Sequence, residues 1–419
     1  MRILEASIAE AYVRDIEQRG SRLDAIEPAV RKIISDVRAT GDEALLRYAR
    51  EFDGLPPDQA LRVSDSEMKV AWKRAPAQLR GALRVAEKNI RRFCELQKPK
   101  AWTKSRYGIS LGQMVRPLDS VGCYVPGGRF PLVSTLLMTV IPAQVAGVKN
   151  IRVWSPRPSP EVLATAAMLG VKEFYRVGGA QAIAALAYGT ETISRVDKIV
   201  GPGNLYVTAA KKLVSFDCAI DMLAGPTEVV IVSAKGNANF IAADLVAQAE
   251  HDPETLAVFV TTSKKLAKSV VDACDIEAQG GPPFHMNENA HGSLVARGAA
   301  LVASSRQQAF DWANRIAPEH ITIEKKDLPL VRNAGSIFVG DYSAQAAGDY
   351  ASGPNHVLPT AGAARFRGGL SVMDFVKLIS VQELSSKGLN QLAPSIVLLA
   401  ETEGLRGHAE SIRARCANA

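Results

Sequence analysis

The chain has 419 residues, 47% of them hydrophobic, so it can bury large cores and is expected to form two or more domains. The net charge is +7, but the chain contains no run of five basic residues. Its densest basic stretch, 91–106, is typical of a solvated helix end rather than of a nucleic-acid surface. The five cysteines are scattered without a CxxC pair, which argues against a disulfide framework and a thiolate zinc site.

The sequence predicts no membrane segment. Its first residues contain no long apolar core and no cleavage signature. The uncharged run 131–148 contains Pro142 and Gln144 and follows a strand-like run, so we expect a crossover helix inside a soluble protein. These features favour a cytoplasmic protein.

Residues 1–95 are expected to be helical, with an interruption at 54–57. From residue 115 onward, strands, glycine-rich turns and helices alternate. The expected strands are 121–125, 151–154, 174–177 and 198–200, and helices are expected after 134, over 160–169, and after the turns at 178–181 and 201–204. Such alternation predicts parallel strands with helices on both faces, which is a doubly wound domain.

A second α/β block begins at residue 228. Its expected strands are 228–232, 256–260, 299–303 and 336–339, its helices are 240–251 and 305–316, and a mostly helical tail follows from about 371. The fold class predicted for the whole chain is therefore α/β, with two doubly wound domains and helical extensions at both ends.

Three strands of the first block end in glycine-rich turns that open helices. Such turns collect backbone N–H groups where a phosphate could bind. No GxGxxG follows any strand, so the usual dinucleotide fingerprint is absent. Each turn is also explained by the tight backbone geometry that glycine allows.

The stretch 247–253, Ala-Gln-Ala-Glu-His-Asp-Pro, ends a predicted helix at Asp252-Pro253. Gln248 and His251 are three residues apart and lie on one face of its last turn. An amide oxygen and an imidazole placed in this way can share a metal ion such as zinc. A histidine that interacts with the helix dipole is the alternative, and it is favoured by this stretch alone.

Two further segments carry groups suited to catalysis. Glu319 and His320 are adjacent just before an expected strand, and both side chains can act as general bases. Asp349 begins a polar loop rich in Gly, Ser and Asn, where functional residues are common. Spacing alone does not show that these groups converge, and a solvated surface position explains each of them singly.

Long motifs across nearly the whole chain resemble the histidinol dehydrogenase family. They are Val-Gly-Cys-Tyr-Val-Pro-Gly-Gly at 121–128, Gly-Gly-Ala-Gln-Ala at 178–182, Val-Gly-Pro-Gly-Asn-Leu-Tyr at 200–206, Ile-Asp-Met-Leu-Ala-Gly-Pro-Thr-Glu at 220–228, Gln-Ala-Glu-His-Asp-Pro at 248–253, Ala-Pro-Glu-His at 317–320, Gly-Asp-Tyr-Ala-Ser-Gly-Pro-Asn-His-Val-Leu-Pro-Thr at 348–360 and Glu-Gly-Leu-Arg-Gly-His at 403–408.

The resemblance implies a zinc-dependent enzyme that oxidises L-histidinol to L-histidine through L-histidinaldehyde with two NAD+, the final steps of histidine biosynthesis. It implies one zinc ion per subunit and a homodimer whose active sites are shared between the chains. Carried over residue by residue, the zinc ligands are Gln248, His251, Asp349 and His408, and the proton acceptors are Glu319 and His320. The NAD contacts are Tyr124, Gln181 and Asn204. The substrate contacts are Thr227 and Glu403, and the substrate is also reached by Gln248, His251, His320, Asp349 and His408.

The resemblance also implies incomplete Rossmann-like domains, which agrees with the missing GxGxxG. The expected division is an N-terminal helical extension (1–20), a first α/β domain that carries the metal site (21–120 and 227–370), a second, NAD-binding α/β domain (121–226) and a C-terminal helical tail (371–419). Thr227 departs from the pattern because many members have serine there, and the loop 278–291, with His285 and His291, is left without a role.

Three other hypotheses compete with this one. The same scaffold and zinc site could serve another small alcohol, because a fold does not fix a substrate. A zinc hydrolase would use Glu319 to activate water and would need no NAD+. A non-catalytic binding protein is the least favoured, since no catalytic position is lost.

Overall fold

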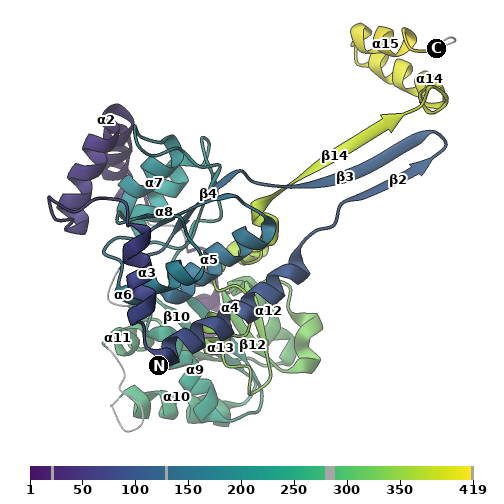
Figure 1. Ribbon diagram of the computed structural model, residues 1–419. Coiled ribbons are helices and arrows are strands. Elements are labelled where there is room, and N and C mark those ends of the chain that lie inside the picture. Colours follow the sequence, from purple (N-terminus) through teal and green to yellow (C-terminus); the bar gives the residue numbers. More distant parts are fainter. Residues whose placement is uncertain (20–22, 128–130, 279–287, 417–419) are drawn as a thin grey trace.

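The computed structural model describes residues 1–19, 23–127, 131–278 and 288–416. Two lobes, each built around a parallel sheet, form the body of the molecule, and a long arm projects from it (Figure 1). The predicted α/β class is therefore confirmed. Among the described residues, no helix is both long and apolar enough to cross a bilayer. His285 lies outside the described residues, as does the side chain of His291.

The first lobe contains a six-stranded sheet in which every pairing is parallel. Its strands, in spatial order, are β1 (Arg2–Glu5), β11 (Ala299–Val302), β10 (Leu256–Thr261), β9 (Glu228–Val232), β12 (His320–Ile323) and β13 (Ser336–Val339). The central strands are continuous apolar runs because both faces of the sheet are covered.

Alternate residues of β9 show how the two faces are filled. Val230 and Val232 pack with α1 (Ala6–Glu17) and α12 (Arg306–Ile316). Val229 and Ile231 pack on the opposite face with α9 (Ala238–Ala249), α10 (Lys264–Ala278) and α11 (Glu288–Ala296). This period of two follows from the pleat of a strand.

The second lobe contains a five-stranded parallel sheet. Its strands, in spatial order, are β6 (Glu173–Tyr175), β5 (Asn150–Trp154), β4 (Ser120–Tyr124), β7 (Lys198–Val200) and β8 (Ala219–Ile220). One face is covered by α5 (Val133–Ala146) and α6 (Pro160–Met168), and the other by α7 (Gly179–Tyr188) and α8 (Leu205–Val214). The uncharged run at 131–148 is thus a buried crossover helix, as expected.

Three N-terminal helices form an outer layer on the second lobe. The helix α2 (Glu27–Asp53) packs on α7 and α8, while α3 (Asp65–Arg74) and α4 (Ala77–Gln97) pack on α6 and α5. The domain division expected from the sequence instead groups 21–120 with the six-stranded lobe. The positions of the domain boundaries stay a prediction. The helices α2, α3 and α4 of the segment 21–120, however, contact the five-stranded lobe.

Each of two segments expected to be helical, 1–95 and the mostly helical tail from about 371, contains a strand. Residues 2–5 form β1, which joins the edge of the six-stranded sheet beside β11. The C-terminal tail contains a nine-residue strand, β14 (Val376–Leu384), paired with β3 (Ile109–Pro117). In both cases the strand partner lies hundreds of residues away, so local periodicity did not reveal it.

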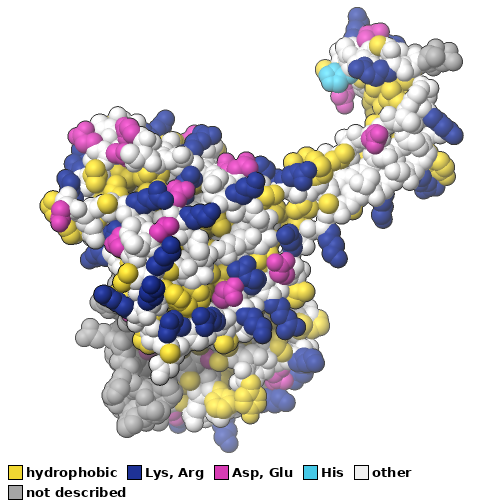
Figure 2. Space-filling model, viewed as in Figure 1, with side chains coloured by type: hydrophobic (Ala, Val, Ile, Leu, Met, Phe, Trp, Pro, Cys, Tyr) yellow, Lys and Arg dark blue, Asp and Glu magenta, His cyan; other side chains and the backbone are white. Residues whose placement is uncertain are grey.

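The arm consists of the antiparallel strands β2 (Trp102–Arg106), β3 and β14, followed by α14 (Ser386–Thr402) and α15 (Arg406–Arg413). It holds α14 and α15 well away from the body (Figure 1). Hydrophobic side chains are exposed along it (Figure 2), including Leu378, Ile379 and Val381 of β14 and Leu398 and Leu399 of α14. Large exposed apolar patches are typical of interaction sites.

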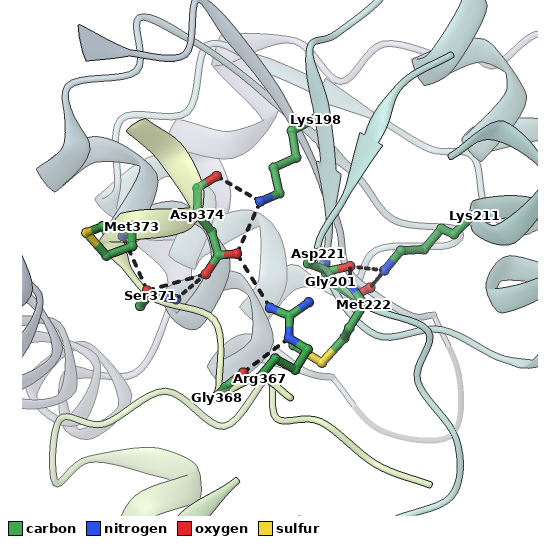
Figure 3. Close-up of polar contacts among 10 residues, drawn as sticks. All are labelled: Lys198, Gly201, Lys211, Asp221, Met222, Arg367, Gly368, Ser371, Met373 and Asp374. Atoms are coloured by element: carbon green, nitrogen blue, oxygen red, sulfur yellow. Dashed lines mark hydrogen bonds and ion pairs between the residues drawn. The ribbon is translucent and has the colours of Figure 1, made fainter. Parts of the chain in front are cut away.

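The remaining short elements are α13 (Gln345–Tyr350) and the 3-10 turns Lys325–Leu330, Ala363–Arg365 and Val372–Phe375, the last of which leads directly into β14. At the root of the arm, Lys198 on β7 donates to the carbonyl oxygen of Asp374 at 2.9 Å and to its Oδ1 at 3.1 Å (Figure 3). The other oxygen of Asp374 accepts from the backbone N–H of Ser371 at 2.9 Å. The arm is therefore fixed to the five-stranded sheet where it begins.

Candidate active site

A cavity of about 1620 Å³ opens between the two sheets. From the six-stranded sheet it is lined by Glu228, Leu256 and His320, which are the first residues of β9, β10 and β12. From the five-stranded sheet it is lined by Pro126 after β4 and by the turn 202–204 after β7. Ligands of doubly wound sheets usually bind at carboxyl ends. Here one sheet contributes its carboxyl edge and the other its amino edge.

Three of the four expected metal ligands line this cavity. Gln248 is on the last turn of α9, is 2% exposed, and donates from Nε2 to Oδ2 of Asp349 on α13 at 3.0 Å. His251 follows two residues after the end of the helix. The structure thus brings an amide, an imidazole and a carboxylate to one wall of the cavity, although Gln248 and Asp349 are 101 residues apart.

The fourth expected ligand is elsewhere. His408 lies in α15 and Glu403 caps the end of α14, both at the far end of the arm. Neither lines the cavity of its own chain. Within the described part of the chain, no group of three or more His, Cys, Asp or Glu side chains gathers in a way that could hold a metal ion.

The donor set in the cavity nonetheless fits zinc. Imidazole and carboxylate are common zinc ligands, and an amide oxygen is compatible with an all-N/O site. Because the amide nitrogen of Gln248 is directed at Asp349, its carbonyl oxygen is the atom left for a metal. The body therefore supplies three of the four ligands expected from the sequence, and these ligand assignments stay predictions.

His320 is the first residue of β12 and Glu319 immediately precedes it; the two residues are 2% and 6% exposed. The Nδ1 atom of His320 is 3.7 Å from Oε2 of Glu319, and its Nε2 is 3.4 Å from Oδ1 of Asp349. Neither ring nitrogen has a hydrogen-bond partner among the described residues. Burial alone would lower the pKa of His320, but the carboxylates of Glu319 and Asp349 outweigh burial and raise it above its ordinary value.

The Glu319 carboxyl group is held from the side of β9. Its Oε2 accepts from the backbone N–H of Glu228 at 3.1 Å. Burial raises the pKa of Glu319 to about 7, against the lowering effect of His320. A carboxylate with a pKa near the working pH is suited to general-base catalysis.

His356 also lines the cavity, although the sequence gave it no assigned role. Its Nδ1 lies 2.7 Å from the carbonyl oxygen of Asp349, and its Nε2 lies 3.4 Å from the hydroxyl of Thr135. A carbonyl only accepts, so Nδ1 carries the proton and donates it. Burial lowers the pKa of His356 and keeps the ring neutral. Its position beside turn residues was the only sequence signal.

The three expected NAD contacts lie on the five-stranded lobe. Asn204 lines the cavity and caps α8 by accepting from the backbone N–H of Val207 at 3.1 Å. Tyr124 and Gln181 are buried behind the cavity wall and do not line it. The hydroxyl of Tyr124 accepts from the N–H of Gly179 at 3.2 Å. These assignments stay predictions.

The glycine turns are anchored by carboxylates of the chain itself. Asp53 accepts from the N–H of Gly178 at 2.9 Å and from Nε2 of Gln181 at 3.2 Å. Asp221 accepts from the N–H of Gly201 at 2.7 Å (Figure 3). The first amide of each turn is therefore already bonded, which fits the absence of the phosphate-binding fingerprint.

Lys211 completes the anchor at Gly201. This lysine and Asp221 form a hydrogen-bonded ion pair in which the side chains are 2% and 0% exposed. Lys211 also donates to the carbonyl oxygen of Gly201 at 2.9 Å. Gly201 has a φ of +114°, and a Cβ there would lie 2.1 Å from the carbonyl oxygen of Tyr124, so only glycine fits.

Comparison with known proteins agrees with this arrangement. A family model described as histidinol dehydrogenase matches residues 16–416. The chain belongs to the histidinol dehydrogenase family. The family prediction and the prediction of an oxidoreductase are both confirmed.

Individual relatives match along almost their entire length. Histidinol dehydrogenase of Geobacter sulfurreducens is 45% identical over 402 residues, which cover 93% of this chain and 93% of that protein. The enzyme of Methanosarcina mazei is 43% identical over 422 residues, which cover 98% of this chain and 96% of that protein. A crystal structure of histidinol dehydrogenase from Elizabethkingia anophelis superposes with a TM-score of 0.93 at 35% identity and covers 99% of this chain and 98% of that one.

Proposed function

We propose that the chain is a zinc-dependent enzyme that oxidises L-histidinol to L-histidine through L-histidinaldehyde, using two NAD+. The observation that carries the proposal is the convergence on one cavity of Gln248, His251, Glu319, His320 and Asp349, which come from three separate segments. Membership of the family supports histidinol as the substrate. The last steps of histidine biosynthesis are then its cellular role.

Bound NAD+ would supply the hydride acceptor, and bound zinc would supply a Lewis acid that orients the substrate. Gln248, His251 and Asp349 are the groups of the body that would hold the metal. In this role the metal acts as a template more than as a source of hydroxide. All acid–base work is then left to side chains of the protein.

His320 acts in the alcohol step. Loss of hydride from an alcohol requires loss of the hydroxyl proton, and a neutral imidazole accepts such a proton well. Both ring nitrogens of His320 lack hydrogen-bond partners among the described residues, so the ring can meet a substrate hydroxyl. The raised pKa makes its neutral form a stronger proton acceptor.

Glu319 acts in the aldehyde step. An aldehyde has no second hydride to give until water adds to its carbonyl group, and that water has to lose a proton. The Glu319 carboxylate, fixed by the Glu228 amide, takes this proton. The two adjacent residues thus serve successive steps.

The arm supports a homodimer with shared active sites. His408 and Glu403 lie too far along the arm to line the cavity of their own chain, and the cavity provides only three of the four proposed metal ligands. A partner chain would bring both residues to the cavity, and a twofold axis would create two such sites.

Turnover with a panel of alcohols tests the proposed substrate. NADH formation is measured with zinc-loaded protein, NAD+ and either histidinol or other small amino alcohols. Histidinol is expected to give the highest kcat/KM by a wide margin. Negligible oxidation of histidinol, with another alcohol turned over well, would refute the assignment, and hydrolysis without NAD+ would point to a different class of enzyme.

A further inference from the structure

An ion pair between a buried carboxylate and a partly exposed arginine lies directly behind Glu319. Glu228 is 4% exposed, and its Oε1 accepts from Arg19 at 2.5 Å and from the backbone N–H of Ala361 at 2.9 Å. The same residue donates its backbone N–H to Oε2 of Glu319 at 3.1 Å. Its own Oε2 has no hydrogen-bond partner among the described residues. One residue therefore touches both the arginine and the candidate base.

Arg19 reaches this position from the segment after α1. It donates to the carbonyl oxygen of Ile16 at 2.9 Å and to that of Ile316 at 3.3 Å. These carbonyls belong to the last turns of α1 and α12, where a cation is favoured by the helix dipoles. The N-terminal segment, which forms no part of the proposed metal or NAD sites, thus supplies a fixed cation to the cavity wall.

We propose that Arg19 and Glu228 are positioning residues that orient Glu319 and set the electric field at its carboxylate during the aldehyde step. The inference rests on the proposed function, because it deepens the role given there to Glu319. As a pair the two side chains are close to neutral, and each alone would place an uncompensated charge beside the base.

The field at Glu319 comes from groups on several elements. They are His320 on β12, Glu228 on β9, Arg19 after α1, Asp349 on α13, and His356 in the following loop. Of these, His320 lowers the pKa of Glu319 and Glu228 raises it. Removing the charge of Glu228 leaves Arg19 unopposed, so Glu319 should hold its proton less tightly.

The test uses pairs of variants with opposite charge effects. In zinc-loaded enzyme supplied with histidinaldehyde and NAD+, the rate rises with pH as Glu319 loses its proton. Glu228→Gln should move this rise to lower pH by about one unit. Arg19→Met, which leaves Glu228 uncompensated, should move it to higher pH. The double variant should return close to the wild-type profile. If one single variant does not fold, the other carries the test.

Asp327→Asn is the matched control. Asp327 is a carboxylate of 5% exposure paired with Arg306, but it lies after the carboxyl end of β12, at the opposite edge of the same sheet. This variant should lower the thermal unfolding temperature without moving the pH profile. The inference would be overturned if the pH–rate profiles of Glu228→Gln and Arg19→Met stay at the wild-type position or move in the same direction.

The outcome of Glu319→Gln separates this inference from the proposed function. If this variant oxidises histidinaldehyde at the wild-type rate, Glu319 is not the base. The role that the proposed function gives Glu319 in the aldehyde step is then refuted. If it loses the aldehyde step while the profiles of the Arg19 and Glu228 variants stay fixed, only the positioning role is refuted.

Discussion

At the residue scale, the proton chemistry is divided between two adjacent side chains with different surroundings. Glu319 is fixed by the Glu228 amide at 3.1 Å, whereas neither ring nitrogen of His320 has a hydrogen-bond partner in the described parts of the chain. Glu319→Gln should slow histidinaldehyde oxidation by roughly 10²–10⁴-fold, the usual cost of losing a general base. The first hydride transfer from histidinol should change much less, because it requires no activated water.

His320→Asn provides the complementary case and should slow the alcohol step. Single-turnover assays that start separately from histidinol and from histidinaldehyde distinguish the two steps. Equal losses in both steps for Glu319→Gln would argue against the division of labour.

His251 tests the metal site directly. It lies in the cavity beside Gln248 and Asp349, and an imidazole is expected to contribute strongly to zinc binding. His251→Ala should therefore lower the amount of bound zinc, measured by elemental analysis after dialysis, together with activity. Retention of one zinc ion per subunit would show that the ligand assignment is wrong. Thermal unfolding of the metal-free variant provides a control for loss of fold.

Local spacing predicted part of this site. Gln248 and His251 are predicted to share the last turn of a helix; both line the cavity, but α9 ends at Ala249, so His251 lies two residues beyond the helix. The approach of Asp349 could not be predicted from spacing, because it depends on how α13 packs on α9 across 101 residues of chain. Arg19 and Glu228 gave no signal of a role and His356 only its position beside turn residues, because contacts with residues far along the chain give each its place in the site.

At the scale of elements, the central strands were the most predictable. The run at 228–232 matches the central strand β9 residue for residue, because both faces of a parallel sheet require apolar side chains. The run at 336–339 matches β13, which lies at the edge of the same sheet. The strands β1 and β14 were missed because β11 and β3 decide their conformation, and no local pattern encodes those partners.

The Lys211–Asp221 pair provides a test of what holds the Gly201 turn. Lys211→Met leaves the fully buried carboxylate of Asp221 without its cation, which should cost about 3–5 kcal/mol of unfolding free energy. Urea unfolding followed by tryptophan fluorescence measures this loss. Lys212→Met removes the neighbouring, partly exposed lysine that pairs with Glu27, and it should cost much less. Equal losses in the two variants would contradict the anchoring role of Lys211.

At the scale of the whole molecule, the arm separates Glu403 and His408 from the rest of the proposed site (Figure 1). A chain that shares its site should be rescued by complementation. When an inactive Gln248→Ala chain is co-expressed with an inactive His408→Ala chain, the mixed dimer should recover about half of the wild-type activity per dimer. One site then combines an intact body with an intact arm, and the other carries both defects.

The mixed dimer needs two controls. Each homodimer should be inactive when purified alone, and zinc content and thermal stability should be measured for all three species. An inactive mixed dimer with normal zinc and a normal fold would mean that each arm serves its own chain.

The central claim is zinc-dependent, four-electron oxidation of histidinol, and the stoichiometry of NADH measures it most directly. Limiting histidinol is converted to completion with excess NAD+ by native protein, by protein stripped with a chelator, and by stripped protein given zinc again. The account predicts two NADH per histidinol with histidine as the product, loss of turnover on chelation, and recovery with zinc. A single NADH per histidinol with accumulated aldehyde, or full turnover by metal-free protein, would contradict it.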